Sequence, residues 1–356
     1  DDSVLPPRHC GIFHVVRLRS GAPVPMCCRL VGSAHGRVVR EIPLRMRVGV
    51  VCLCCALAVC TACSSASPTA SAPPVTSVPT TTLAPATTST VIATVPATVA
   101  PVSTVPVPVG VEVSGSAPSG DAAFLGTARR VQVGAVQIGY RQFGTGVDIV
   151  LIAGEGSGMD TWPITFLRAM AGRFRVTIFD GRDLGYSTFT SVGFSLGDLA
   201  NDTVGLIGAL GLHQPVVFGW STGGEIALLM AAQHPGVAAA YVVSGAEGGK
   251  GRSVSASPSA ERCQASDPPT CGLVHLLFTR DTAGRAAADA YVADYVKVPH
   301  PAAARDMMRR YVEAEREFLW HTEVPYGSIV DRLVVMNGDA DELVPAENAR
   351  LIAAAM

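Results

Sequence analysis

Hydrophobic and polar positions in the later two thirds of the chain predict short strands that alternate with helices. Strand-type runs end in turn-forming residues, and the runs between them have the spacing of an amphipathic helix. This alternation predicts an α/β fold, with a mainly parallel twisted sheet and helices on both faces. The strand runs are Val131–Phe143, with hairpin-like alternation, Ile149–Ala153, Val176–Phe179, Pro215–Phe218, Tyr241–Ser244 and Leu333–Met336, and the helix runs are Leu196–Leu210 and Gly223–Gln233.

A longer insertion between two strand runs interrupts this alternation at about residues 247–326. It contains two helical runs, Ala283–Val296 and Ala302–Leu319. We therefore divide the predicted folded part, residues 121–356, into a body that forms the sheet and an inserted cap.

The beginning of the chain has a different pattern, and residues 46–63 are similar to a bacterial lipoprotein signal. Met46-Arg47 precedes the apolar run Val48–Cys60, and small residues lead up to Cys63. A basic start and about 7–15 apolar residues are typical of a signal peptide, whereas a membrane-spanning helix needs about 20. The similarity implies that Cys63 is lipidated, with ordinary secretion as the alternative. We expect residues 1–45 to be an unstructured upstream extension.

Residues 64–120 consist mainly of Ser, Thr, Pro, Ala and Val, and Glu112 is their one charged residue. Small side chains supply little apolar area and Pro removes backbone donors, so this segment cannot bury a core. We predict a disordered linker between an anchor and the folded domain. The domain would then lie outside the cytoplasm, held at the membrane by the lipid on Cys63.

Charge and composition exclude several classes of protein. The formal net charge is −2, so no strong field attracts nucleic acid. With 48% hydrophobic and 16% charged residues, the chain as a whole is not disordered. The low net charge also favours an uncharged substrate. Eight of the ten cysteines precede residue 64, and no cluster of Cys and His has the spacing of a metal site.

The clearest chemical signal is the segment Gly219-Trp220-Ser221-Thr222-Gly223-Gly224, between a strand run and a helix run. It matches G-x-S-x-G in a strand–turn–helix context. In so sharp a turn the central residue is strained, and side chains two positions away would collide, which explains the glycines. The hydroxyl of Ser221 would lie at a helix N-terminus, whose dipole stabilises developing negative charge. Ser221 is therefore predicted to be a nucleophile.

Three other loops follow strand runs, where sheets of this type bind ligands. The glycine-rich loop 153–158 can direct a backbone N–H toward Ser221, forming an oxyanion hole with the N–H of Thr222. The loop 338–345 contains carboxylates that could orient a histidine. The loop 180–187 is expected to be a turn held by an arginine–carboxylate bond.

With these motifs in this order, residues 128–356 resemble a capped, single-domain α/β-hydrolase. The resemblance implies that Ser221 is the nucleophile and that Asp341 is the acid, with Asp339 as the second choice. It also implies that the backbone N–H groups of Glu155 and Thr222 form the oxyanion hole. Two positions depart from the family pattern: Ala153 replaces a histidine of the oxyanion loop, and Asp183 replaces a glycine in the turn at 180–187.

The catalytic histidine is the main departure from the family. In α/β-hydrolases it follows the acid, but no histidine follows Asp341 in this chain. We expect the chain to be truncated at its C-terminal end and, as a fragment, inactive. His213 and His234 are expected on the wrong side of the sheet, and none of the cap histidines, His275, His300 and His321, is assigned a role.

The cap adds two further expectations. Caps of this family shape the substrate pocket, so Trp220 is a candidate for its lining, with core packing as the alternative. Cys263 and Cys271 close a short loop of the cap, and in an exported protein such a pair is expected to form a disulfide.

These observations predict an extracytoplasmic serine hydrolase of small or medium carboxylic esters, or of amides, that needs neither a metal nor an organic cofactor. One alternative is an inactive, tethered binding module on the same scaffold. Another is a cofactor-free haloperoxidase-like or peptidase-like member of the same fold. The sequence does not indicate an oligomeric state.

Overall fold

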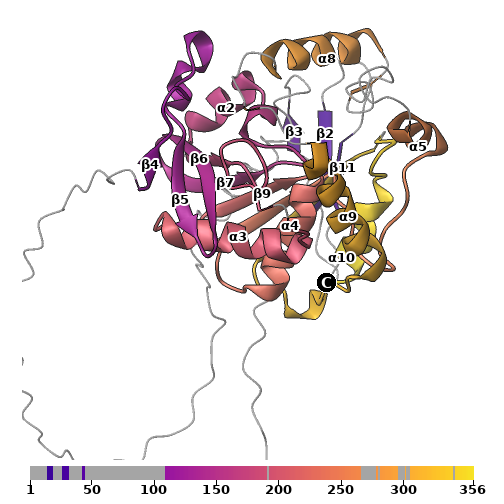
Figure 1. Ribbon diagram of the computed structural model, residues 1–356. Coiled ribbons are helices and arrows are strands. Elements are labelled where there is room, and N and C mark those ends of the chain that lie inside the picture. Colours follow the sequence, from indigo (N-terminus) through magenta and orange to yellow (C-terminus); the bar gives the residue numbers. More distant parts are fainter. Residues whose placement is uncertain are drawn as a thin grey trace, which may run out of the picture.

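A twisted sheet forms the centre of the computed structural model, and helices pack on both of its faces (Figure 1). The structure describes residues 109–356, except 191, 266–277, 280, 296–300, 302–304 and 340, together with the backbone of three short strands before residue 45. The strands are β1 (His14–Leu18), β2 (Met26–Val31), β3 (Ile42–Leu44), β4 (Val111–Glu112), β5 (Arg129–Val133), β6 (Val136–Gly144), β7 (Val147–Ile152), β8 (Phe174–Phe179), β9 (Val216–Trp220), β10 (Ala240–Ser244) and β11 (Arg332–Gly338).

The strands join in the order β3-β2-β1-β11-β10-β9-β7-β8-β6-β5-β4. Strands β8, β7, β9, β10 and β11 are mutually parallel, while the hairpin β5–β6 joins them antiparallel, through β6 and β8. The predicted α/β class with a mainly parallel sheet is therefore confirmed. Each predicted strand run coincides with an observed strand or, for Val131–Phe143, with this hairpin.

The helices confirm the two predicted helix runs of the body and add others. The helix Leu196–Ala209, which precedes β9, begins with a capping box. The Ser195 side chain accepts the N–H of Asp198, and the Asp198 carboxylate accepts the N–H of Ser195. The α-helices are α2 (Ile164–Ala171), α3 (Leu196–Ala209), α4 (Thr222–Gln233), α5 (Pro258–Ala265), α8 (Thr282–Tyr295), α9 (Arg305–His321) and α10 (Glu347–Ala354), and the short 3-10 helices are Gly120–Leu125, Met159–Thr161 and Tyr326–Ser328.

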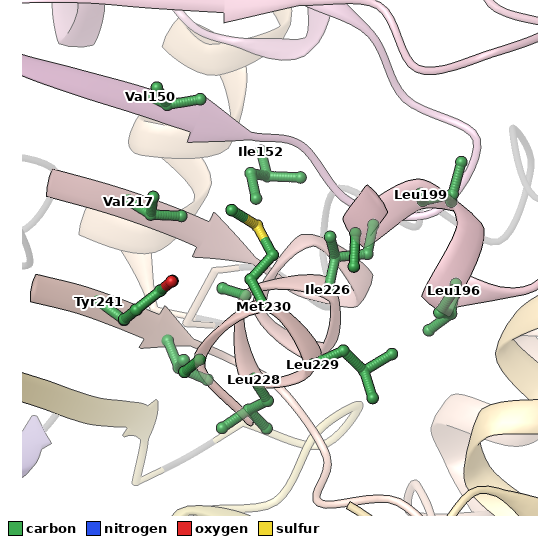
Figure 2. Close-up of a cluster of buried hydrophobic side chains, with 14 of the residues drawn as sticks. Val150, Ile152, Leu196, Leu199, Val217, Ile226, Leu228, Leu229, Met230 and Tyr241 are labelled. Atoms are coloured by element: carbon green, nitrogen blue, oxygen red, sulfur yellow. The ribbon is translucent and has the colours of Figure 1, made fainter. Parts of the chain in front are cut away.

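One face of the sheet buries α4 almost completely. Every residue from Thr222 to Ala232 is buried. Figure 2 shows Met230 of α4 next to Ile152 and Val217 of the sheet, in the same buried cluster. A helix enclosed on all sides must be apolar all round, and α4 is so except at its first turn. Its N-terminus, where Ser221 lies, is therefore held by packing along the whole helix.

The other face of the sheet is covered by α2 and its preceding loop. Leu167 and Met170 of α2 are fully buried, in a cluster with Trp162 and with Phe218 of β9. The two clusters are separated by the sheet, so β9 is packed from both sides up to the point where Ser221 begins.

The insertion between β10 and β11 carries α5, α8 and α9. Helix α9 turns Met307, Tyr311, Ala314 and Phe318 toward the body, an i, i+4, i+7, i+11 spacing that gives one buried stripe. Helix α8 packs near α2, where the Thr165 hydroxyl donates to an Asp294 oxygen at 2.9 Å. Figure 1 shows α8 along one end of the molecule.

Strands β1, β2 and β3 lie within residues 1–45, which the sequence predicted to be an unstructured extension. Strand β1 pairs in parallel with β11, from His14 opposite Val334 to Leu18 opposite Gly338, and β2 pairs antiparallel with β1. An edge strand such as β11 presents unpaired N–H and C=O groups that a further strand can satisfy.

The end of the predicted linker 64–120 is ordered, because β4 pairs antiparallel with β5 and the buried Ser116 accepts the N–H of Ala128. The predicted division of the chain at 1–45, 46–63 and 64–120 stays a prediction.

Within the described part of the chain, no helix has both the length and the apolar character required to span a membrane.

Candidate active site

Ser221 stands at the turn between β9 and α4, where the sequence placed it. Its backbone has φ 56° and ψ −131°, a left-handed conformation that is costly for a residue with a side chain. A Cβ at Gly219 would collide with the carbonyl oxygen of Gly223, and one at Gly223 would collide with that of Ile152. The Ser221 N–H donates to the carbonyl of Ser244 at 2.8 Å, which ties the turn to β10. Only this arrangement of glycines leaves room for the turn.

The loop after β7 lies directly against the turn. A Cβ at Gly154 would be 3.1 Å from the Cβ of Ser221, so the backbone before Glu155 approaches the nucleophile candidate closely. Thr222 is the first residue of α4, and the first N–H groups of a helix have no acceptor within it. The residues predicted for the oxyanion hole thus come from the two segments that flank Ser221.

Asp341 follows β11, two strands away from β9. Ser244 is aligned both with Trp220 of β9 and with Met336 of β11, so the ends of these three strands lie side by side. One oxygen of Asp341 accepts the N–H groups of Leu343 and Val344, at 2.9 and 2.8 Å. Burial raises the pKa of Asp341, and these two hydrogen bonds oppose the rise. The loop fixes the carboxylate at the same edge of the sheet as Ser221.

The turn at 180–187 is held by arginine–carboxylate bonds, as its sequence indicated. Arg182 binds Asp202 of α3 through two hydrogen bonds of 2.7 and 2.8 Å, and Asp183 pairs with Arg310 of α9 at 2.7 Å. Asp183 has φ 66°, the region that favours glycine. This explains why the α/β-hydrolase pattern has a glycine there, and the ion pair with Arg310 compensates for the departure.

Four carboxyl groups that sequence reasoning did not connect lie around the turn; we call Glu155, Glu225, Glu247 and Glu315 the carboxylate cluster. Glu225 is in the first turn of α4, Glu247 follows β10, and Glu315 is on α9. The hydroxyl of Thr222 donates to Glu315, and Glu315 interacts electrostatically with Glu155. These four residues are far apart in the chain, and no pattern in the sequence indicates that they lie close together in the fold.

Burial dominates the protonation of the carboxylate cluster. It raises the pKa of Glu155 to about 8, with the neighbouring Glu315 adding to the rise and Arg316 opposing it. It raises the pKa of Glu247 to about 7, again with a contribution from Glu315. Burial also raises the pKa of Glu225 well above its usual range, reinforced by the other three carboxyl groups. Several carboxyls of the cluster are therefore partly protonated near neutral pH.

The described histidines lie away from Ser221. His213 is exposed before β9, and His234 ends α4 at the opposite end of the helix, where its ring is 2.9 Å from Asn201. His321 is exposed at the end of α9. His275 and His300 fall outside the described residues.

Of the other residues that the sequence singled out, the structure describes the side chain of Trp220 but not those of the three cysteines. Trp220 is partly exposed and packs against Trp162, with ring centroids 6.3 Å apart, so at least part of its ring belongs to the core. Cys63 and Cys271, and the side chain of Cys263, lie outside what the structure describes. Among the described residues, no group of three or more His, Cys, Asp or Glu side chains is arranged to hold a metal ion.

The family comparison agrees with this geometry. Residues 149–266, about a third of the chain, match the family model described as the α/β hydrolase fold. The sheet topology and the turn at Ser221 thus define a domain with the α/β-hydrolase fold, as the sequence resemblance implied.

Individual relatives are similar over part of their length. Serine hydrolase BPHL of Mus musculus is 33% identical over 125 residues, which are 34% of this chain and 43% of that protein. An α/β hydrolase fold protein from Chitinophaga pinensis has a TM-score of 0.55 at 20% identity, over 63% of this chain and 84% of that one. The esterase RhEst1 from Rhodococcus sp. ECU1013 has a TM-score of 0.50 at 21% identity, over 63% and 85%. The chain thus matches less than half the length of this curated relative, and the two solved structures show the fold alone.

Proposed function

We propose that this protein is a serine hydrolase that cleaves a small or medium carboxylic ester, or an amide. Ser221 attacks the carbonyl carbon and the ester or amide bond breaks, expelling the alcohol or amine and leaving an acyl-enzyme. Water then cleaves the acyl-enzyme to release the carboxylic acid and regenerate Ser221, and the chemistry needs no cofactor. The observation that carries the proposal is the strained backbone of Ser221 at the buried N-terminus of α4. Strain of this kind costs on the order of 1–3 kcal/mol and persists where function requires it.

The surroundings of Ser221 support the reaction that we propose. Negative charge that develops on the carbonyl oxygen would be stabilised by the N–H groups of Thr222 and Glu155 and by the positive end of α4. Asp341 would orient a histidine that accepts the proton of Ser221. None of the described histidines stands near the turn, so we place this histidine outside the described residues.

We also propose that the domain works outside the cytoplasm, tethered to the membrane through lipid on Cys63. The support is the sequence pattern of residues 46–63 and the composition of the segment that follows. Secretion without lipid is the alternative, and mass spectrometry of the mature N-terminus distinguishes the two.

Hydrolysis of a p-nitrophenyl ester by the full-length protein tests the proposed chemistry. We expect Ser221→Ala to lower kcat/KM by about a thousandfold or more, because the nucleophile is removed. Circular dichroism should be unchanged, since alanine fits the same turn. Equal turnover by the two proteins would refute the nucleophile, and no turnover by either would favour an inactive binding module.

A further inference from the structure

The carboxylate cluster concentrates acidic groups beside the nucleophile candidate in a chain whose overall charge is only −2. Glu315 accepts the hydroxyl of Thr222, the residue after Ser221. Glu155 follows Gly154, which abuts the Ser221 side chain, and Glu225 lies one turn along α4. Three different segments thus bring carboxyl groups to the same small region.

The innermost member of the cluster has an unsatisfied oxygen. Glu225 is 2% exposed, yet its Oε2 atom is buried without a hydrogen-bond partner, and the Oε1 atom of Glu155 is in the same condition. A buried acceptor that is left unpaired destabilises the fold, and more so when it is charged. Repulsion by Glu155, Glu247 and Glu315 adds to the raised pKa of Glu225, so Glu225 lies within electrostatic range of the other three.

The described part of the protein does not supply a cation to neutralise these groups. None of the four carboxylates forms an ion pair with a described Lys, Arg or His. Arg316, the one cation that influences Glu155, is itself exposed. Arg252 lies over the ring of Tyr326, 5.4 Å from its centroid, and forms no ion pair with the cluster. Among the described residues, the cluster therefore consists of acidic groups that form no ion pair.

We propose that the carboxylate cluster binds the ammonium group of a substrate that carries a primary or secondary amine close to its scissile ester or amide. This rests on the hydrolase function proposed for Ser221. An ammonium group offers several N–H donors and can be bound by one or two carboxylates at a time, without the compact ligand set that a metal ion needs. A metal ion is a poorer fit, because the described carboxylates are not arranged as metal ligands. The low net charge of the chain had favoured an uncharged substrate, and the local cluster reverses that expectation.

Ligand binding to the full-length Ser221→Ala protein tests the inference without requiring turnover. The probes are alaninamide and propionamide, which differ by the amino group, and calorimetry gives their affinities. We expect alaninamide to bind at least about tenfold more tightly, the effect of one or two charge-assisted hydrogen bonds. Glu315→Gln and Glu247→Gln should abolish most of this preference. The matched control Glu313→Gln, on the exposed face of α9, should retain it.

A second experiment determines whether the amine belongs to the acyl group or to the alcohol group of the ester. In the Ser221-containing protein, kcat/KM is compared for alanine ethyl ester against ethyl propionate, and for an aminoalkyl ester of butyrate against the matching alkyl ester. A preference of at least about tenfold in one pair, lost in Glu315→Gln and kept in Glu313→Gln, assigns the acyl or the alcohol side.

Equal binding of alaninamide and propionamide would overturn the inference, and so would a preference that survives Glu315→Gln and Glu247→Gln. In either case the role of the four carboxyls is structural. These results are independent of the hydrolase proposal. If Ser221 proves inert while alaninamide still binds through the cluster, only the proposed chemistry fails. Glu315 and Glu247 are partly exposed, so we expect Glu315→Gln and Glu247→Gln to fold. They can therefore be measured even if the variant of the buried residue, Glu225→Gln, does not fold.

Discussion

Ser221 and its flanking glycines show how far single residues can be interpreted from sequence. The G-x-S-x-G pattern gave the position of the turn and its strain, because the collisions that forbid side chains at Gly219 and Gly223 are local. The carboxylate cluster could not be predicted in the same way. Its members come from a loop, two helices and a strand end, and only the fold brings Glu155 and Glu315 together.

The raised pKa values of the cluster predict a pH-dependent stability. A carboxyl whose pKa is higher in the folded state than in the unfolded state stabilises the protein below about pH 4.5, and this contribution is lost as the pH rises. With the pKa of Glu247 at about 7 and that of Glu155 at about 8, the loss extends from about pH 5 to 8.

Chemical denaturation at several pH values measures this effect. We expect the free energy of unfolding to fall by on the order of 5 kcal/mol between pH 5 and 8. Glu155→Gln and Glu247→Gln should each flatten the profile, whereas the exposed Glu313→Gln should not. A wild-type profile that rises over this interval would contradict the raised pKa values.

At the scale of helices and strands, most of the body followed from periodicity, and the misses have physical reasons. Helix α2 is only eight residues long, so its three buried positions make a weak pattern. Helix α5 is short and polar. The long helix α9 was predicted, but its contact with the turn at Asp183 was not. Hydrophobic periodicity does not indicate which distant residues form a buried ion pair, here Asp183 and Arg310.

That ion pair predicts different costs for two adjacent arginines of α9. Arg310→Ala should lower the free energy of unfolding by about 3–5 kcal/mol, because it leaves the fully buried Asp183 carboxylate without a counter-ion. Arg309→Ala removes only an exposed i, i+4 pair with Glu313 and should cost less than about 0.5 kcal/mol. Urea denaturation compares the two, and similar losses would show that the Asp183 pair does not hold α9.

For the whole molecule, the sequence predicted a folded domain behind a signal and a linker, and the domain is the part that the structure describes in detail. The pairing of β1 with β11 was not foreseen. Strand partners at a sheet edge are chosen by non-local contacts, here between opposite ends of the chain. The lipid on Cys63, the base of the reaction and the location outside the cytoplasm stay predictions.

The central claim is that Ser221 is an activated nucleophile, and a fluorophosphonate probe tests it most directly. Such probes react with serines that a base and an oxyanion hole activate, and mass spectrometry locates the adduct. On the full-length protein we predict one adduct on Ser221, absent from Ser221→Ala and prevented by prior unfolding. A folded protein that leaves Ser221 unlabelled, or is labelled equally after Ser221→Ala, would contradict the account.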